Sequence, residues 1–276
     1  ADWNIDAYND YAIVVQDTSS FFTIRSVSVT APPGLCGIYL GNVTNGLLDA
    51  VASSQDYGIC LVGSRRTTVR ASVIGSRIIV ESSSTILMEN NTVAGDLDIL
   101  DSNNVTAVSN HVSGTDGLVV SHSEDSLLEA NNVSGSQSTG VYVFATNNTT
   151  LSGNIVWSGP QAGILLEYAA NTTIRDNHLF DVGILIRPAP RFYFTTLAIP
   201  PGNFVNGWPI VFHNNCADVV ENGSTLGQLI VVSCSRLMAT NLTIERTHAG
   251  ILLAYDNDGL VASNELRWNR WGAVWV

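Results

Sequence analysis

The chain has 276 residues, of which 24 are Asp or Glu and 12 are Arg; no lysine occurs, and the formal net charge is −12. A chain this acidic, with no clustered basic stripe, is repelled by phosphate backbones, so nucleic acid is excluded as a partner. Although 45% of the residues are hydrophobic, no stretch approaches the roughly 20 apolar residues that a membrane span needs.

In chain order, segments that begin like GIYL, GLVV, GVYV or GILL recur from about Tyr11 to Gly272 at a spacing of roughly 19 to 27 residues, which is typical of solenoids. Within each repeat, apolar residues alternate as in strands, and turn residues separate three short runs. This pattern predicts an all-β chain, a parallel β-helix of about twelve coils in a single domain, 1–276.

An asparagine stands fourteen positions after seven of the coil starts: Asn91, Asn110, Asn131, Asn154, Asn177, Asn241 and Asn264. Asn tolerates the backbone angles of tight turns, and an inward amide can bond the same amide one coil above and below. A stacked ladder would satisfy polar groups that are costly to bury alone. We therefore expect an internal Asn ladder.

The four cysteines fit an oxidising compartment. Cys36 and Cys60 lie on adjacent coils but about three positions out of phase, so they are free, bridged through a local bend, or linked between subunits. Cys216 and Cys234 both stand seven positions after their coil starts, which places their Cα atoms about 5 Å apart. We predict a disulfide between Cys216 and Cys234.

The chain begins at Ala1 without Met, as after removal of a signal peptide, but a partial chain would begin in the same way. The argument for secretion therefore comes from the Asn-X-Ser/Thr sequons. Asn104, Asn148 and Asn171 share an outer turn position and are expected to be good acceptors, whereas Asn241 belongs to the inward ladder and is expected to be bare. The full set of expected N-glycan acceptors is Asn42, Asn90, Asn104, Asn132, Asn148, Asn171 and Asn222.

The outward position two residues after each coil start is almost entirely apolar. It reads Tyr39, Cys60, Ile79, Asp98, Val119, Tyr142, Leu165, Leu185, Val211, Leu229 and Leu252. Paired carboxylates at glycosidase separation are not evident, so we identify no catalytic residue and predict that the chain is not an enzyme. The densest acidic group is Asp96, Asp98 and Asp101, with Glu81 and His122 on neighbouring coils; it suits calcium or a positioned proton, and a solvated acidic patch is the simpler interpretation.

No metal site or cofactor is predicted. The segment Tyr255–Gly259 resembles a calcium loop but lacks the distal Glu. The five histidines do not pair at ligand spacing, since the two that share a phase, His111 and His178, are about 15 Å apart.

The repeats, and above all NFVNGWPIVFHNN followed by GQLIVVSCSRLMATNLTIERTHAGILLAYDNDGLVASNEL, resemble the NosD-like β-helix repeat proteins that are abundant among surface and secreted proteins of methanogenic archaea. The resemblance covers nearly the whole chain and implies a right-handed, single-stranded β-helix. It says little about activity, because the architecture serves many functions. In that family the Asn-Gly-x-Pro element, here Asn206 to Pro209, marks an inserted loop, which we place at about 187–208.

The apolar outward row predicts a second layer, because one face of a solvated sheet is normally polar. The insertion, with Phe192, Tyr193, Phe194, Leu197 and Ile199, covers a few coils at most, so we expect lateral packing between copies of the chain. The expected contacts are Tyr39, Tyr142 and Leu165 laterally, and Val274 and Trp275 end to end, where the last strand lacks a cap.

These observations favour an extracellular structural protein that assembles with itself into a cell-surface sheath, S-layer or filament. The alternative is a carbohydrate-binding or polysaccharide-processing β-helix resembling pectate lyase, in which Asp98, Asp101 and Glu81 are the candidate residues. A third is a periplasmic metal-cofactor maturation factor.

Overall fold

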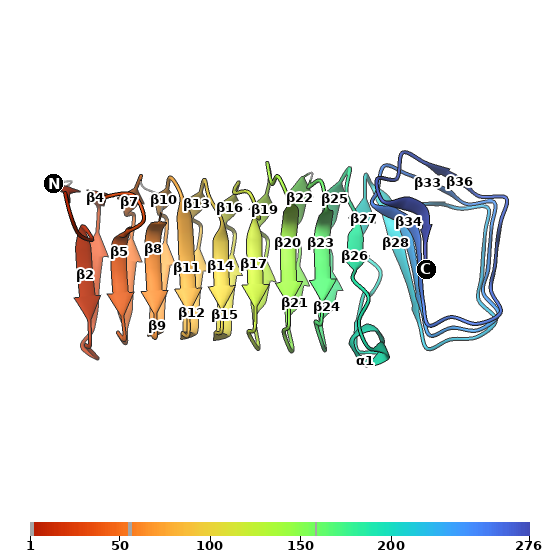
Figure 1. Ribbon diagram of the computed structural model, residues 1–276, viewed down its shortest axis with the longest axis horizontal. Helices are drawn as coiled ribbons and strands as arrows, with labels where there is room; N and C mark the ends of the chain where they lie inside the picture. The colour runs from red at the N-terminus through yellow and green to blue at the C-terminus, as the bar shows by residue number, and fades with distance from the viewer. Residues whose placement is uncertain (1–2, 55–56, 158) are drawn as a thin grey trace.

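The structure is a computed structural model that describes residues 3–54, 57–157 and 159–276. It is a right-handed parallel β-solenoid of about 13 turns, as the repeat predicted. Figure 1 shows two stacks of coils. The first stack runs across the view with its strands side by side, whereas the last coils overlap, so the axes of the two stacks cross at a large angle.

Three parallel sheets form the walls of the first stack. Sheet 1 consists of β2 (Ile13–Gln16), β5 (Cys36–Gly41), β8 (Tyr57–Val62), β11 (Arg77–Glu81), β14 (Leu97–Leu100), β17 (Leu118–Ser121), β20 (Thr139–Phe144), β23 (Ala162–Glu167) and β26 (Ile184–Ile186). Sheet 2 consists of β3 (Phe22–Arg25), β6 (Gly46–Asp49), β9 (Arg65–Arg70), β12 (Ser84–Glu89), β15 (Asn103–Val108), β18 (Leu127–Glu129), β21 (Thr150–Ser152) and β24 (Thr173–Arg175). Sheet 3 consists of β1 (Trp3–Asp6), β4 (Val27–Thr30), β7 (Ala52–Ser53), β10 (Val73–Ile74), β13 (Thr92–Val93), β16 (His111–Val112), β19 (Asn132–Val133), β22 (Ile155–Trp157), β25 (His178–Phe180) and β27 (Phe204–Val205).

The second stack repeats this arrangement after residue 207. Its strands are β28 (Trp208–Asn214), β31 (Gln228–Val232), β34 (Ala249–Ala254) and β37 (Gly272–Trp275) on one side, β29 (Val220–Asn222), β32 (Met238–Thr240) and β35 (Leu260–Ala262) on the second, and β30 (Thr225–Leu226), β33 (Thr243–Glu245) and β36 (Glu265–Arg267) on the third. Within the described part of the chain, no helix has the length and apolar character needed to cross a membrane.

A two-residue hairpin joins the stacks. Asn206 and Gly207 both have positive φ, 51° and 82°, which is the geometry of the Asn-Gly turns that favour tight hairpins. The turn makes β27 and β28 antiparallel, with Val205 opposite Trp208. The chain therefore reverses at the element that the sequence analysis treated as the end of an inserted loop, and the second stack winds away from the first.

The segment 187–208 is partly a coil of its own. It contains the short helix α1 (Arg191–Thr195), after which Ala198 bridges to Thr173 and Val205 pairs with Leu179. Asn203 is fully buried and continues the Asn ladder. The insertion thus ends by rejoining the repeat one coil beyond Asn177.

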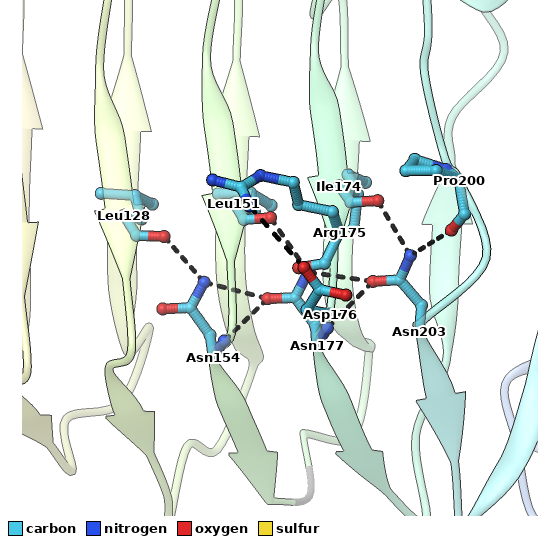
Figure 2. Close-up of polar contacts among 9 residues, drawn as sticks. All are labelled: Leu128, Leu151, Asn154, Ile174, Arg175, Asp176, Asn177, Pro200 and Asn203. Carbon is cyan, nitrogen blue, oxygen red and sulfur yellow. Dashed lines mark hydrogen bonds and ion pairs between the residues drawn. The ribbon is translucent and has the colours of Figure 1, made fainter.

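The ladder lies at the turn between sheets 2 and 3 (Figure 2). The Nδ2 group of Asn154 donates to Oδ1 of Asn177 at 3.0 Å and to the carbonyl of Leu128 at 2.8 Å, while the main-chain N–H of Asn154 donates to the same Oδ1 at 2.9 Å. Each amide therefore satisfies groups on two neighbouring coils. The members in the first stack are Asn91, Asn110, Asn131, Asn154, Asn177 and Asn203.

Asn241 does not belong to this ladder, so its inward assignment is wrong. It is exposed, has a φ of 53° and donates to Asn222 on the previous coil. Leu242 takes the buried position instead, and its N–H donates to Oδ1 of Asn264, which does point inward. The error arises from a slip of one residue, because Leu229 rather than Gln228 aligns with Ile251.

The ladder gives a direct test of the coil phase. Asn131 is completely buried and the next residue, Asn132, faces outward. Replacing Asn131 with Leu removes an acceptor used by both nitrogen atoms of Asn110 and should lower the free energy of unfolding by about 1 to 3 kcal/mol. Asn132→Leu is the matched control and should change it little. Urea denaturation measures both, and equal losses would contradict the assigned phase.

Candidate functional site

A groove on the outer surface of sheet 1 brings several polar side chains of the first stack together. Its volume is about 330 Å³. The register of sheet 1 brings the outward residues Asp98, Val119, Tyr142 and Leu165 side by side on successive strands, as the sequence predicted. The other lining residues include Arg77, Asp116, Ser138, Thr139, Gln161 and Arg187, which flank these strands.

Asp96 organises one end of the groove. One of its carboxylate oxygens accepts the main-chain N–H groups of Asp116 and Gly117 at 2.8 and 3.1 Å, and the other lies 2.8 Å from a guanidinium nitrogen of Arg77. All of the strong partners that Asp96 needs are thus supplied within the protein. Its role is to fix the turn before β17 and the position of Arg77.

Asp98 is the titratable group of the groove. Its side chain is only 11% exposed, and Nε of Arg77 lies 3.3 Å from it. Burial raises the pKa of Asp98 to about 6, and the negative charges of Asp96 and Asp116 act in the same direction, while Arg77 lowers it. Desolvation therefore outweighs the ion pair, and Asp98 can hold or release a proton near neutral pH.

Tyr142 and Arg187 form the other end of the groove. The Tyr142 hydroxyl donates to Oε2 of Glu167 at 2.8 Å, and Nη1 of Arg187 lies 2.7 Å from the same oxygen. Burial, together with the Glu167 hydrogen bond, raises the pKa of Tyr142 to about 12, so its hydroxyl stays protonated. The groove thus contains the Asp98 carboxyl together with two sets of polar groups that are held in place: Asp96 with Arg77, and Tyr142 with Glu167 and Arg187.

The other acidic candidates lie elsewhere. Glu81 and Asp101 are both exposed and do not line the groove. His122 follows Asp101 by one coil in the same turn position, as predicted. Its ring contacts that of Phe144, with 5.0 Å between the ring centroids, and it lines a different cavity. Within residues 3–54, 57–157 and 159–276, no three His, Cys, Asp or Glu side chains are grouped so as to hold a metal ion.

Arg77, Asp116 and Gln161 were not predicted, because they lie outside the row of positions two residues after each coil start. Arg77 stands at a coil start and Asp116 directly before one. Polar residues at these flanking positions were the available signal. Tyr142 was assigned to assembly, and the structure gives its hydroxyl a partner within the same chain.

Leu165, which was expected to contact another copy, and Leu185, which belongs to the same outward row, prove to be buried. Leu165 and Leu185 are each 2% exposed and belong to the same apolar cluster as Ile230 and Leu252 of the second stack. Leu165 is therefore unavailable for lateral packing. Val211 and Leu229 were also expected to face outward, but they pack in the second stack's own core.

The remaining assembly candidates differ in exposure. Tyr39 is partly exposed and stacks on Tyr11 at 5.0 Å between ring centroids. Trp275 packs partly against the shared cluster, whereas Val274 is exposed. Val274 pairs with Ile251 in the strand register, and the side chain of Ile251 lies in the second stack's core. Val274 therefore occupies an inward position of the coil, not an outward one.

The structure contains two disulfides. Cys216 and Cys234 are joined as predicted, with their Cα atoms 4.4 Å apart. Cys36 and Cys60 are also joined, with a Cα separation of 5.9 Å, although Cys36 pairs with Tyr57 and Cys60 with Tyr39 in the strand register. Of the three alternatives for this pair, the intramolecular bridge is the one observed. Disulfides are typical of secreted and extracellular proteins.

The expected glycan acceptors are accessible. Asn132 is partly exposed, and the other six are exposed: Asn42, Asn90, Asn104, Asn148, Asn171 and Asn222. Asn104, Asn148 and Asn171 share a turn position with positive φ. Asn241 occupies an exposed turn as well, so the reason for expecting it to be bare no longer holds. Glycosylation itself stays a prediction.

Comparisons with known proteins agree with this architecture. A family model described as a right handed beta helix region matches residues 71–195. No curated protein matches the chain.

Several solved structures have a similar fold. A mutant of the periplasmic alginate epimerase AlgG is 11% identical, with a TM-score of 0.52 over 92% of this chain and 76% of that chain. The surface adhesin PfbA of Streptococcus pneumoniae is 8% identical, with a TM-score of 0.46 over 92% and 90%. An alpha-1,3-glucanase of Streptomyces thermodiastaticus is 14% identical, with a TM-score of 0.44 over 95% and 64%.

The similarity to the alginate epimerase contradicts the prediction that the chain is not an enzyme. That epimerase has a similar fold, and two carboxylates of the acidic group found in the sequence, Asp96 and Asp98, both contact Arg77. At such low identity the comparisons show the fold, and the chemistry has to be argued from the residues of this chain.

The Asp98 environment predicts a particular pH dependence. Because its folded-state pKa is raised from 3.8 to about 6, the stabilisation due to protonated Asp98 is complete below pH 3.8 and is lost as the pH rises through about 6. Asp98→Asn should remove this loss. The stability of the variant relative to the original chain should rise by on the order of 2 to 3 kcal/mol between pH 4 and 7. Urea denaturation across that range measures it, and a flat difference would contradict the raised pKa.

Proposed function

We propose that this protein is a secreted carbohydrate-active β-helix that binds an extended polysaccharide on sheet 1 and processes it at Asp98. The observation that carries the proposal is the convergence of a nearly buried carboxyl, Asp98, with Arg77, Tyr142 and Arg187 in one open groove. A sugar chain offers many hydroxyls, and a groove with fixed donors and acceptors at both ends suits them.

Asp98 would act as a general acid or base. A carboxyl whose pKa lies near 6 is protonated often enough at neutral pH to protonate a leaving oxygen, and it is also ionised often enough to accept a proton. Asp116, on the next coil, is exposed and supplies a second carboxylate at the same end of the groove. Tyr142 stays protonated and Arg187 is held by Glu167, so both orient rather than exchange protons.

The charge of the groove favours a neutral polysaccharide. Arg77 is neutralised by Asp96 and Asp98, and Arg187 by Glu167, which leaves Asp116 as an additional negative charge. The whole chain carries a net charge of −12. A polyuronate would meet repulsion at long range, which would slow its association.

A cell-surface or secreted location is part of the proposal. The two disulfides fit an oxidising compartment, and the accessible sequons fit a glycoprotein. The archaeal origin suggested by the sequence resemblance stays a proposal as well.

The test combines binding with turnover. A panel of neutral glucans, mannans and xylans, with alginate and polygalacturonate alongside, is assayed by calorimetry and by the release of reducing ends. We expect a neutral polysaccharide to bind and to be cleaved, and Asp98→Asn to lower turnover by roughly a hundredfold or more with little change in affinity. Asp101→Asn, an exposed acid outside the groove, is the control and should be unaffected. Absence of binding across the panel, or equal effects of the two substitutions, would contradict the proposal.

Self-assembly is a second candidate function, and one surface favours it. On the second stack, Val220, Met238 and Leu260 stand side by side on β29, β32 and β35, and all three are exposed. A row of adjacent exposed apolar side chains is a typical contact surface. A sheath or filament would use this row in place of Leu165.

Assembly through this row predicts sensitivity to charge. Met238→Glu would bury an uncompensated carboxylate in the contact and should prevent association, because that burial costs several kcal/mol. Thr92→Glu, an exposed position on sheet 3 of the first stack, is the control. Light scattering over a concentration series measures the molar mass. A chain that is monomeric at all concentrations, or a Met238 variant that associates normally, would rule out this contact.

A further inference from the structure

A second cavity lies where α1 packs beside the turns that follow sheet 1. Its volume is about 510 Å³. Three successive turns and the helix form its walls, and the lining residues are His122, Glu124, Ala145, Thr146, Asn147, Tyr168, Ala170, Phe192 and Tyr193. In Figure 1, α1 lies below β26, at the end of the first stack.

Contacts with the second stack hold the helix wall in place. Phe194 is buried and packs against Tyr255 at 5.5 Å between ring centroids. Nε of Arg191 donates to the Ser233 hydroxyl at 2.9 Å, and Nδ2 of Asn214 donates to the carbonyl of Thr195 at 3.0 Å. The cavity is therefore formed before anything binds, which lowers the entropic cost of binding.

Three of the lining residues are Phe or Tyr, and their rings are at least partly open to solvent. Phe192 is 56% exposed and Tyr168 is 39% exposed. Tyr193 sits between them, with ring centroids 5.5 Å from Tyr168 and 5.6 Å from Phe192, in edge-to-face contacts. In an edge-to-face contact the edge of one ring packs on one face of the other. Phe192 makes one such contact, with Tyr193, so at least one face of its ring lies outside it.

The polar groups around these rings fit hydroxyls better than an ion. Among the lining residues Glu124 is the sole carboxylate and there is no arginine, so an anion finds no partner. His122 and Asn147 provide further hydrogen-bonding groups. A surface of exposed aromatic faces with scattered polar side chains matches a pyranose ring, which has an apolar C–H face and hydroxyls at its rim.

The cavity is connected to the groove through a continuous series of rings. Tyr142 lines the groove and stacks on Phe144 at 5.9 Å with an interplanar angle of 29°. Phe144 in turn contacts Tyr168 at 6.2 Å. A polysaccharide that occupies the groove can therefore extend over Phe144 into the cavity without leaving an aromatic surface.

We propose that the cavity between α1 and the turns at Ala145 and Tyr168 is a distal sugar subsite, which binds a neutral glycosyl unit of the same polysaccharide that occupies the Asp98 groove. This inference rests on the proposed function. The insertion of α1 thereby lengthens the binding surface, and affinity depends on the length of the sugar chain.

Length-dependent binding tests the subsite. Oligosaccharides of about two to eight units, prepared from β-1,4-glucan, β-1,3-glucan, α-1,3-glucan and mannan, are titrated into the unglycosylated chain by calorimetry. We expect Phe192→Ala to weaken binding of the longest bound oligosaccharide by roughly tenfold or more and to leave the shortest bound one unchanged. Tyr168→Asn should do the same, and Asn suits its positive φ of 52°. Phe21→Ala is the control, because Phe21 is an exposed aromatic residue near the N-terminal end of the first stack, far from the cavity.

The outcomes separate this inference from the proposed function. If oligosaccharides bind but Phe192→Ala and Tyr168→Asn change no affinity, or change it equally at every length, the subsite is refuted and the groove proposal stands. If the original chain binds no oligosaccharide of any length, both are refuted. Loss of turnover in Asp98→Asn with unchanged length dependence supports the division of roles between the groove and the cavity.

Discussion

The stacking of buried side-chain amides at one corner of the coil is the interaction on which the rest of the structure depends. Each turn between sheets 2 and 3 leaves main-chain N–H and C=O groups inside the core, where water does not reach them. The Asn ladder supplies partners, since one amide bonds the coil before it and the coil after it. At another corner, Ser64, Ser83, Ser102 and Ser123 serve in the same way, and the main-chain N–H of each of the first three donates to the hydroxyl of the next serine.

These two columns fix the register, and the register fixes the surface. Because side chains alternate across a strand, a slip of one residue would exchange the core for the outer face. With the phase held, outward residues line up on successive coils, so Asp98 lies between Ile79 and Val119. The groove is therefore assembled from residues far apart in sequence, and its acidity comes from turns on neighbouring coils.

The repeat revealed the fold of the first stack because its coils share one ladder position from Asn91 to Asn177. The repeat gave wrong positions where the spacing between successive ladder residues changed. Asn203 was hidden by the helix that precedes it, and Asn241 was misassigned because the coil start was placed at Gly227, one residue early. The same one-residue error assigned Leu229 to the outer face, although Leu229 is fully buried. The direction of the second stack depends on the positive φ angles at Asn206 and Gly207, and no periodicity encodes it.

The site was only partly predictable for a related reason. Asp98 was found because a carboxylate stands out in an apolar row, but Arg77 and Asp116 contribute from turns that the row does not include. The apolar row itself has a different cause from the one expected. Leu165 and Leu185 are covered within the chain, in a cluster shared with the second stack, so their apolar character reflects the change of axis at the hairpin. Where that cover ends, toward Tyr142 and Asp98, the surface becomes polar and opens into the groove. The hairpin that ends the first stack thus also sets the limit of the groove.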